Sequence, residues 1–187
     1  MCYNQNNPII RRLFVESGRK GFRLYNVMFP LWMLLLFPAA WLVALPVNFA
    51  IDLGVVVLSL KAMGAPDVKA SAKLCILRVW LMGFLADFIG GFLMLLSNLL
   101  EFSGPFGTWF YEKITIPVAL NPFTSLPAFL YTTLCLALSG LCIYWLNRGY
   151  ALKRLSILPE EKHRLALTLA LCTAPYLFYF PTTLLYR

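Results

Sequence analysis

One nearly uninterrupted apolar stretch, residues 24–60, constrains this chain more than any other feature. As a single helix with a rise of about 1.5 Å per residue it would be about 55 Å long, whereas the hydrocarbon core of a bilayer is about 30 Å thick. The stretch must therefore tilt steeply, leave the membrane or turn back within it.

Three further apolar runs follow, at 79–100, 125–147 and 165–186, and each has the length of one membrane crossing. Of the 187 residues, 60% are hydrophobic and 13% charged, whereas soluble domains carry about 25% charged residues. The runs are continuously apolar rather than alternating, which is typical of helices and not of barrel strands. The sequence predicts an all-α polytopic integral membrane protein in which residues 1–187 form a single transmembrane domain.

The distribution of Lys and Arg indicates how the first apolar stretch crosses, because short cytoplasmic loops hold an excess of both. If it forms a helical hairpin, 14 of the 16 cations lie on one side, in 1–24, 61–78 and 148–164. If it crosses once, the better orientation puts nine on one face and seven on the other. We therefore expect an N-terminal hairpin that turns just before Pro46, since proline interrupts helical geometry.

About five crossings result, with the basic segment 1–24 in the cytoplasm and the C-terminus outside, most plausibly in the plasma (inner) membrane. The expected crossings are 25–44, 46–62, 79–100, 125–147 and 165–186. Residues 65–80 are expected to lie as an amphipathic segment on the anionic lipids of the inner leaflet. A new helix is expected to begin at Pro159, with Glu160 and Glu161 in its first turn.

The only long outer loop, 101–125, is unusually aromatic and contains "PFGTWFY". Aromatic side chains favour the membrane interface. We expect this loop to lie on the lipid surface or fold back against the helices, with a partner-binding surface as the alternative.

Most catalytic chemistry lacks the residues it needs. His163 is the only histidine, which argues against histidine triads, bis-histidine haem and zinc-protease motifs. The five cysteines form no CxxC pair, and no phosphate-binding glycine loop occurs. The net charge of +8 is explained by membrane topology rather than by nucleic acid. We predict no catalytic, cofactor-binding or metal-binding residues.

Two carboxylates within the crossings are the strongest candidates for function. A charge at the bilayer centre costs about 2.5–3.5 kcal/mol on insertion scales, so Asp52 and Asp87 should face protein or water. One interpretation is a pair that handles protons or cations, with Asn48 and Asn98 as polar contacts. The other, which the lack of an intramembrane Lys or Arg favours, is hydrogen-bonded glue between helices or toward another subunit.

Small residues at helical spacing predict close helix packing, within the chain or against a partner. They are Gly83, Ala86, Gly90, Gly91, Ala166, Ala170 and Ala174. Membrane-protein partners or a homo-oligomer are therefore expected.

Three classes of function follow from these patterns. The first is a non-catalytic membrane subunit of a transport, secretion or defence complex. The alternative is a small channel or transporter for ions, protons or small solutes that uses Asp52 and Asp87. A lipid-modifying enzyme is the third class. The sequence does not show the cluster of polar residues at one membrane face that such an enzyme would need.

Overall fold

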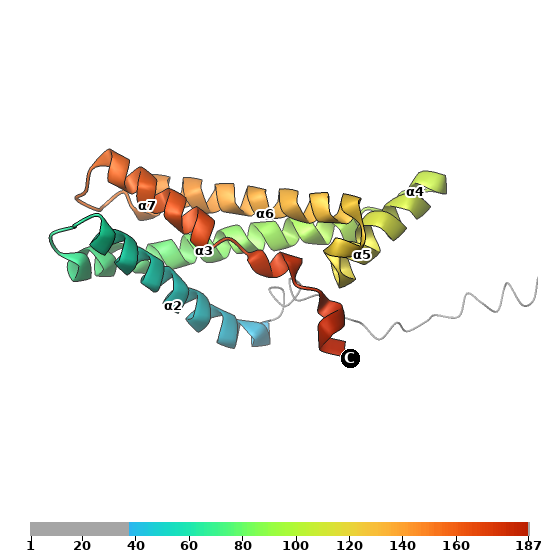
Figure 1. Cartoon of the computed structure of the whole chain (residues 1–187), viewed down its shortest axis with the longest axis horizontal. Coiled ribbons are helices and arrows are strands. Elements are labelled where there is room, and N and C mark those ends of the chain that lie inside the picture. The colour runs from blue at the N-terminus through green and yellow to red at the C-terminus, as the bar shows by residue number, and fades with distance from the viewer. Residues whose placement is uncertain (1–37, 187) are drawn as a thin grey trace, which may run out of the picture.

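The computed structural model describes residues 38–186, and all regular structure in that range is helical. The α-helices are α2 (Pro38–Ala62), α3 (Val68–Leu99), α4 (Gly104–Phe110), α5 (Ile116–Leu120), α6 (Leu126–Leu146) and α7 (Pro159–Cys172). Wider π-helical turns occupy Tyr111–Thr115 and Asn147–Ala151, and 3-10 turns occupy Pro122–Thr124, Tyr176–Tyr179 and Thr182–Tyr186. Figure 1 shows α3 and α6 side by side along most of their length.

Helix α3 is the centre of the bundle. It packs against α2 on one side and α6 on the other, while α7 contacts both α6 and α2. The four helices meet at the end of the molecule where α2 turns into α3, and α2 diverges from α3 toward the opposite end (Figure 1).

Three helices in the described range are long and apolar enough to cross a membrane: Leu45–Ala62, Val68–Leu99 and Leu126–Ala151. The expectation of a helical membrane protein is confirmed at this level. The first expected crossing, 25–44, falls largely outside the described residues, as does the segment 1–24. The count of five crossings stays a prediction.

The predicted break before Pro46 is wrong, because α2 runs without interruption from Pro38 to Ala62. Proline removes one backbone donor, but membrane helices tolerate this where neighbouring helices supply other contacts. Here the indole Nε1 of Trp80 donates to the Leu45 carbonyl at 3.0 Å, and the Trp80 ring meets Phe49 edge to face. No hairpin turn falls within Pro38–Ala62.

The second difference concerns residues 65–80, which do not form a separate surface segment. Helix α3 already begins at Val68, where the Asp67 carboxylate accepts from the Ala70 amide at 3.0 Å. With 32 residues it is about 48 Å long, so it exceeds the hydrocarbon core by several turns. Its basic first turns continue the crossing helix instead of lying beside it.

The last expected crossing, 165–186, is not one helix. Helix α7 begins at Pro159 as expected but ends at Cys172, and its 14 residues span only about 21 Å. Pro175 and Pro181 follow, and neither can donate a backbone hydrogen bond. The chain nevertheless continues past α6 to the far end, where the Thr182 hydroxyl hydrogen-bonds the Ala119 and Leu120 carbonyls.

The two ends of the bundle differ in charge. Nine of the ten Lys and Arg in residues 38–186 lie at the end where α2 turns into α3 and α6 turns toward α7, which we call the basic end. They are Lys61, Lys69, Lys73, Arg78, Arg148, Lys153, Arg154, Lys162 and Arg164. Lys113 lies at the other end.

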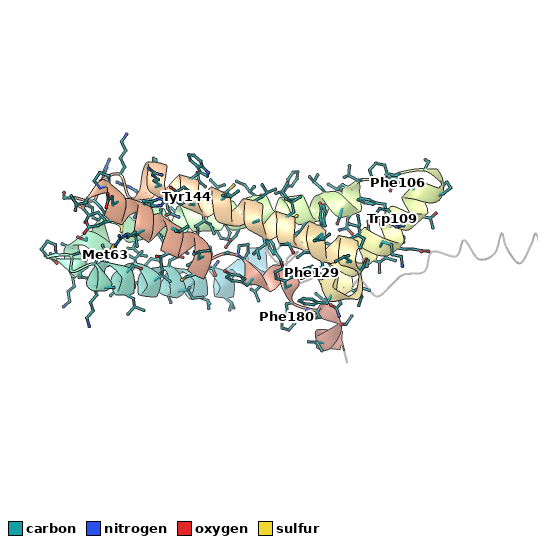
Figure 2. All side chains as sticks on the ribbon, turned by 45° about the horizontal axis from the view of Figure 1, so that its top comes forward. Met63, Phe106, Trp109, Phe129, Tyr144 and Phe180 are labelled. Carbon is teal, nitrogen blue, oxygen red and sulfur yellow. The ribbon has the colours of Figure 1, made fainter. Side chains whose placement is uncertain are left out.

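Aromatic side chains characterise that other end, the aromatic end. The expected loop 101–125 is largely helical, and the Phe106 ring contacts Phe102, Trp109 and Phe110. Figure 2 shows Phe106 and Trp109 far from Met63, which marks the basic end. Both rings are exposed, as is expected of aromatic side chains at a membrane interface.

The apolar core of the described residues falls into two clusters. The larger is at the basic end and includes Val56, Leu60 and Ala86. The smaller is toward the aromatic end and includes Met94 and Phe178. Along α3 the boundary between them falls at residues 87–91, which places Asp87 between two apolar clusters.

Candidate functional site

Asp52 and Asp87 lie on neighbouring helices, on the faces that α2 and α3 turn toward each other. On α2, Asp52 shares a buried stripe with Val56 and Leu60, four residues apart. On α3, Asp87 lies one turn after Gly83, and both are buried. The two carboxyl groups are close enough to interact electrostatically. We call Asp52 and Asp87 the carboxyl pair.

Gly83 makes room for this approach. A methyl group added to Gly83 would lie 3.4 Å from Oδ2 of Asp52, so the carboxylate rests directly on the glycine backbone. Asp52 is 5% exposed and Asp87 8% exposed, although both are ionisable. Oδ1 of Asp87 has no hydrogen-bond partner within residues 38–186. Two other buried oxygens in the described range share this condition, on Thr132 and Asn147, but Asp87 is the ionisable one of the three.

Thr173 adds a third oxygen from a third element. Its hydroxyl faces the Asp52 carboxyl group from the residue that ends α7. The same hydroxyl lies 2.8 Å from the Leu169 carbonyl, to which it donates. A threonine hydroxyl has one proton and two lone pairs. That single proton can be donated to the Leu169 carbonyl or to the Asp52 carboxyl group, since both lie within reach of the hydroxyl.

The break after α7 places an unfinished helix end at this position. The last carbonyls of a helix lack intrahelical amide partners and carry the negative end of the helix dipole. After Thr173 the chain turns at Pro175 into the 3-10 turn Tyr176–Tyr179, and the Tyr176 hydroxyl donates back to the Leu171 carbonyl. The C-terminal end of α7 therefore lies beside Asp52, one member of the carboxyl pair.

The site is electronegative and no nearby cation compensates it. Neither aspartate forms an ion pair with a Lys or Arg in the described range. In the same range no three His, Cys, Asp or Glu residues converge as metal ligands would. The donor set is thus two carboxyl groups and one hydroxyl, all oxygen, which suits a proton or a hard cation.

The two asparagines proposed as polar contacts are not equivalent. Asn48 is half-buried on α2, one turn before Asp52 and on the same face. Asn98 is exposed near the end of α3, and its amide donates to Ser97 Oγ at 3.3 Å. The separation of Asn98 from Asp87 along α3 is about 16 Å at 1.5 Å per residue, so Asn98 does not join the site.

The small residues on α3 contact elements of the same chain. The Ala86 carbonyl accepts a hydrogen bond from Ser139 Oγ of α6 at 3.0 Å. A methyl group on Gly90 would come within 2.8 Å of the Phe178 ring and 2.9 Å of Ser139 Cβ. Gly91 is buried beside it. Two helices and the C-terminal segment thus approach α3 closely at this stripe.

The small residues on α7 show a graded burial. Ala166 is fully buried and Ala170 is 8% exposed, while Ala174 is half-buried beyond the end of the helix. The Ala170 carbonyl lies 3.7 Å from the position of a methyl group on Gly140 of α6. This stripe therefore faces α6.

Three residues of the site were missed by sequence reasoning: Thr173, Ser139 and Phe178. Thr173 carried a signal, since a hydroxyl residue two positions before Pro175 falls where an apolar helix must end. Ser139 and Phe178 carried none, because a single serine in an apolar helix and one phenylalanine among 15 are unremarkable.

Comparison of the chain with protein-family models, curated proteins and solved structures finds no match. The function is therefore inferred from the geometry of the carboxyl pair.

Proposed function

We propose that this protein is a small channel or transporter that binds a proton or a monovalent cation at the carboxyl pair. The observation that carries the proposal is Oδ1 of Asp87, a buried oxygen without a hydrogen-bond partner that belongs to a carboxyl group facing Asp52. Ionisable residues inside a membrane mark substrate and ion pathways, proton relays, voltage sensors or ligand counter-ions.

The broken crossing supports the same proposal. Transporters commonly place their ion sites near the midplane, where interrupted helices present carbonyls and the ends of half-helices to the ion. Here α7 ends at Cys172, and the hydroxyl of the next residue, Thr173, faces Asp52. An incoming cation would meet oxygen donors from α2, α3 and the end of α7.

The orientation of the ion path follows from charge. We infer that the basic end faces the cytoplasm of a plasma membrane, because cytoplasmic loops are enriched in Lys and Arg. The aromatic end, with exposed Phe106 and Trp109, then lies at the outer interface.

A non-catalytic subunit of a larger membrane complex is the second candidate. The sequence favoured it because the chain is small, shows no catalytic constellation and carries small residues along its helix faces. In the structure Asp52 lies against Gly83, and Ser139 and Phe178 lie against Gly90. Elements of the same chain thus cover this small-residue face, which supports the ion-handling proposal over the subunit function.

The decisive experiment measures proton, sodium and potassium flux in proteoliposomes for wild type and Asp87→Asn. The amide keeps the size and hydrogen-bonding capacity of the carboxyl group but cannot bind a proton as a charged base. We expect flux in the wild type and its loss in Asp87→Asn, with unchanged gel-filtration elution and thermal unfolding.

Asp67→Asn is the matched control, since Asp67 is exposed at the start of α3 and asparagine also caps helices well. It should conduct as wild type does. Equal flux in wild type and Asp87→Asn would refute the proposal. A wild-type protein that moves no ion and purifies with a stoichiometric membrane partner would favour the subunit function instead.

A further inference from the structure

A cluster at the basic end, separate from the carboxyl pair, joins α6, the turn after it and α7. The Tyr144 hydroxyl lies 2.8 Å from Nδ1 of His163 and accepts a hydrogen bond from the Arg148 guanidinium. The Arg148 guanidinium also lies over the Tyr144 ring, 5.8 Å from its centroid. We call Tyr144, Arg148 and His163 the tyrosine cluster, and Figure 2 labels Tyr144 beside α7.

Most hydrogen-bonding capacity of this cluster is unused. A guanidinium has five N–H donors, and the one hydrogen bond of Arg148 in the described structure goes to Tyr144. No carboxylate among residues 38–186 pairs with Arg148. His163 contacts Tyr144 through Nδ1, which leaves its Nε2 free for another partner. Both Arg148 and His163 are exposed.

The surrounding charges are largely committed elsewhere. Glu161 accepts from the Leu158 amide at 2.9 Å at the start of α7. The Lys162 ammonium donates to the Lys153 carbonyl at 3.2 Å. Glu160 is the acidic neighbour with no such contact. The net field at the cluster is positive, since Lys153, Arg154 and Arg164 lie at the same end.

The position of the cluster indicates where its ligand comes from. Trp145, next to Tyr144 in sequence and in edge-to-face ring contact with it, is 68% exposed. Tryptophan at the end of a membrane helix lies at the level of the lipid headgroups. A planar guanidinium held beside it can bind two oxygens of a phosphate group at once.

We propose that the tyrosine cluster binds the phosphate group of an anionic glycerophospholipid in the leaflet at the basic end. Arg148 and His163 are the donors, and the Tyr144 hydroxyl positions both of them. This inference does not depend on ion transport, because the cluster and the carboxyl pair share no residue.

The test counts lipids bound to the purified full-length protein by native mass spectrometry, with phosphatidylglycerol against phosphatidylcholine. Wild type should retain phosphatidylglycerol selectively. Arg148→Gln should bind it at least about tenfold more weakly, the loss expected when a hydrogen bond to a charged group is removed. Tyr144→Phe keeps the ring but releases both donors, so it should weaken binding in the same direction.

Arg154→Gln is the matched control, an exposed arginine at the same end that lies outside the cluster. It should lose no more than about fivefold in affinity, the effect of one exposed arginine near an anionic surface without a specific contact. An equal loss in Arg154→Gln and Arg148→Gln would overturn the proposal in favour of diffuse charge. Displacement of the lipid by millimolar inorganic phosphate would assign the site to free phosphate.

Structural failure is distinguished by thermal unfolding in each lipid. If Arg148→Gln unfolds earlier by the same amount in phosphatidylcholine and phosphatidylglycerol, the cluster only clamps α6 to α7 and the lipid site is refuted. A loss of stabilisation confined to phosphatidylglycerol supports the site.

Discussion

Helix α3 and the segment 159–186 both run between the basic end and the aromatic end, yet they do so differently. Helix α3 is one uninterrupted helix of 32 residues, whereas 159–186 consists of α7, a break at Thr173 and two short 3-10 turns. An unbroken helix pairs its interior amides and carbonyls with one another, and a neighbour can only share such a carbonyl, as Ser139 does at Ala86. A broken helix leaves its last carbonyls without an amide partner in the same helix, and this break falls beside Asp52.

The two segments contribute different features to the structure. Helix α3 supplies the small residues Gly83 and Gly90, which let other elements approach its backbone. The C-terminal segment uses that space, since Phe178 packs on Gly90 and Thr173 faces the pair. Stability should therefore depend most on α3, and ion binding on the break.

The largest effect on stability is expected for Gly90→Ala. The new methyl group would meet Ser139 Cβ at 2.9 Å and the buried Phe178 ring at 2.8 Å, so overpacking should cost about 1–3 kcal/mol. Gly54→Ala is the matched control, because no atom lies within 4 Å of its added methyl group. Denaturation in mild detergent should separate the two variants. Equal unfolding midpoints would mean that the C-terminal segment does not rest on α3.

An intermediate effect is expected for Pro175→Ala, which restores a backbone donor at the break. Loss of the rigid residue should lower stability by about 0.4–1 kcal/mol, while the new amide allows α7 to extend. Hydrogen exchange at residues 174–177 should slow, and ion flux should fall as the break closes. Pro181→Ala, beyond the site, is the control. Unchanged exchange would show that tertiary packing, rather than proline, maintains the break.

The smallest effect on stability is expected for Thr173→Val. Its hydroxyl bonds the Leu169 carbonyl four residues earlier, and Thr168 bonds the Arg164 carbonyl in the same way. Each valine variant should lose only about 0.6 kcal/mol, the average for such bonds in membranes. Only Thr173→Val should weaken the ion dependence of flux, since only Thr173 faces Asp52. The same flux defect in both variants would remove Thr173 from the proposed site.

The sequence by itself determined the features whose free energies add up residue by residue along the chain. Transfer of apolar side chains into lipid adds up residue by residue, so the runs at 79–100 and 125–147 were sufficient to predict α3 and α6 as spans. The start of α7 was equally local, because Pro159 suits a first turn. The same reasoning identified Asp52 and Asp87 as exceptional without relating one to the other.

Only the tertiary structure decided which faces meet. The rotation of α2 and α3 about their axes, which brings Asp52 onto Gly83, depends on contacts between residues far apart in sequence. Helix α2 likewise continues through Pro46, where Trp80 of another helix donates to the Leu45 carbonyl. The apolar run 165–186 is long enough for one crossing, but α7 ends at Cys172, and Pro175 lacks the backbone N–H that would continue the helix. Hydropathy does not register that missing donor. Hydropathy records the transfer of each residue into lipid, whereas the site arises from pairs of helices, and pair energies do not appear in a sum over single residues.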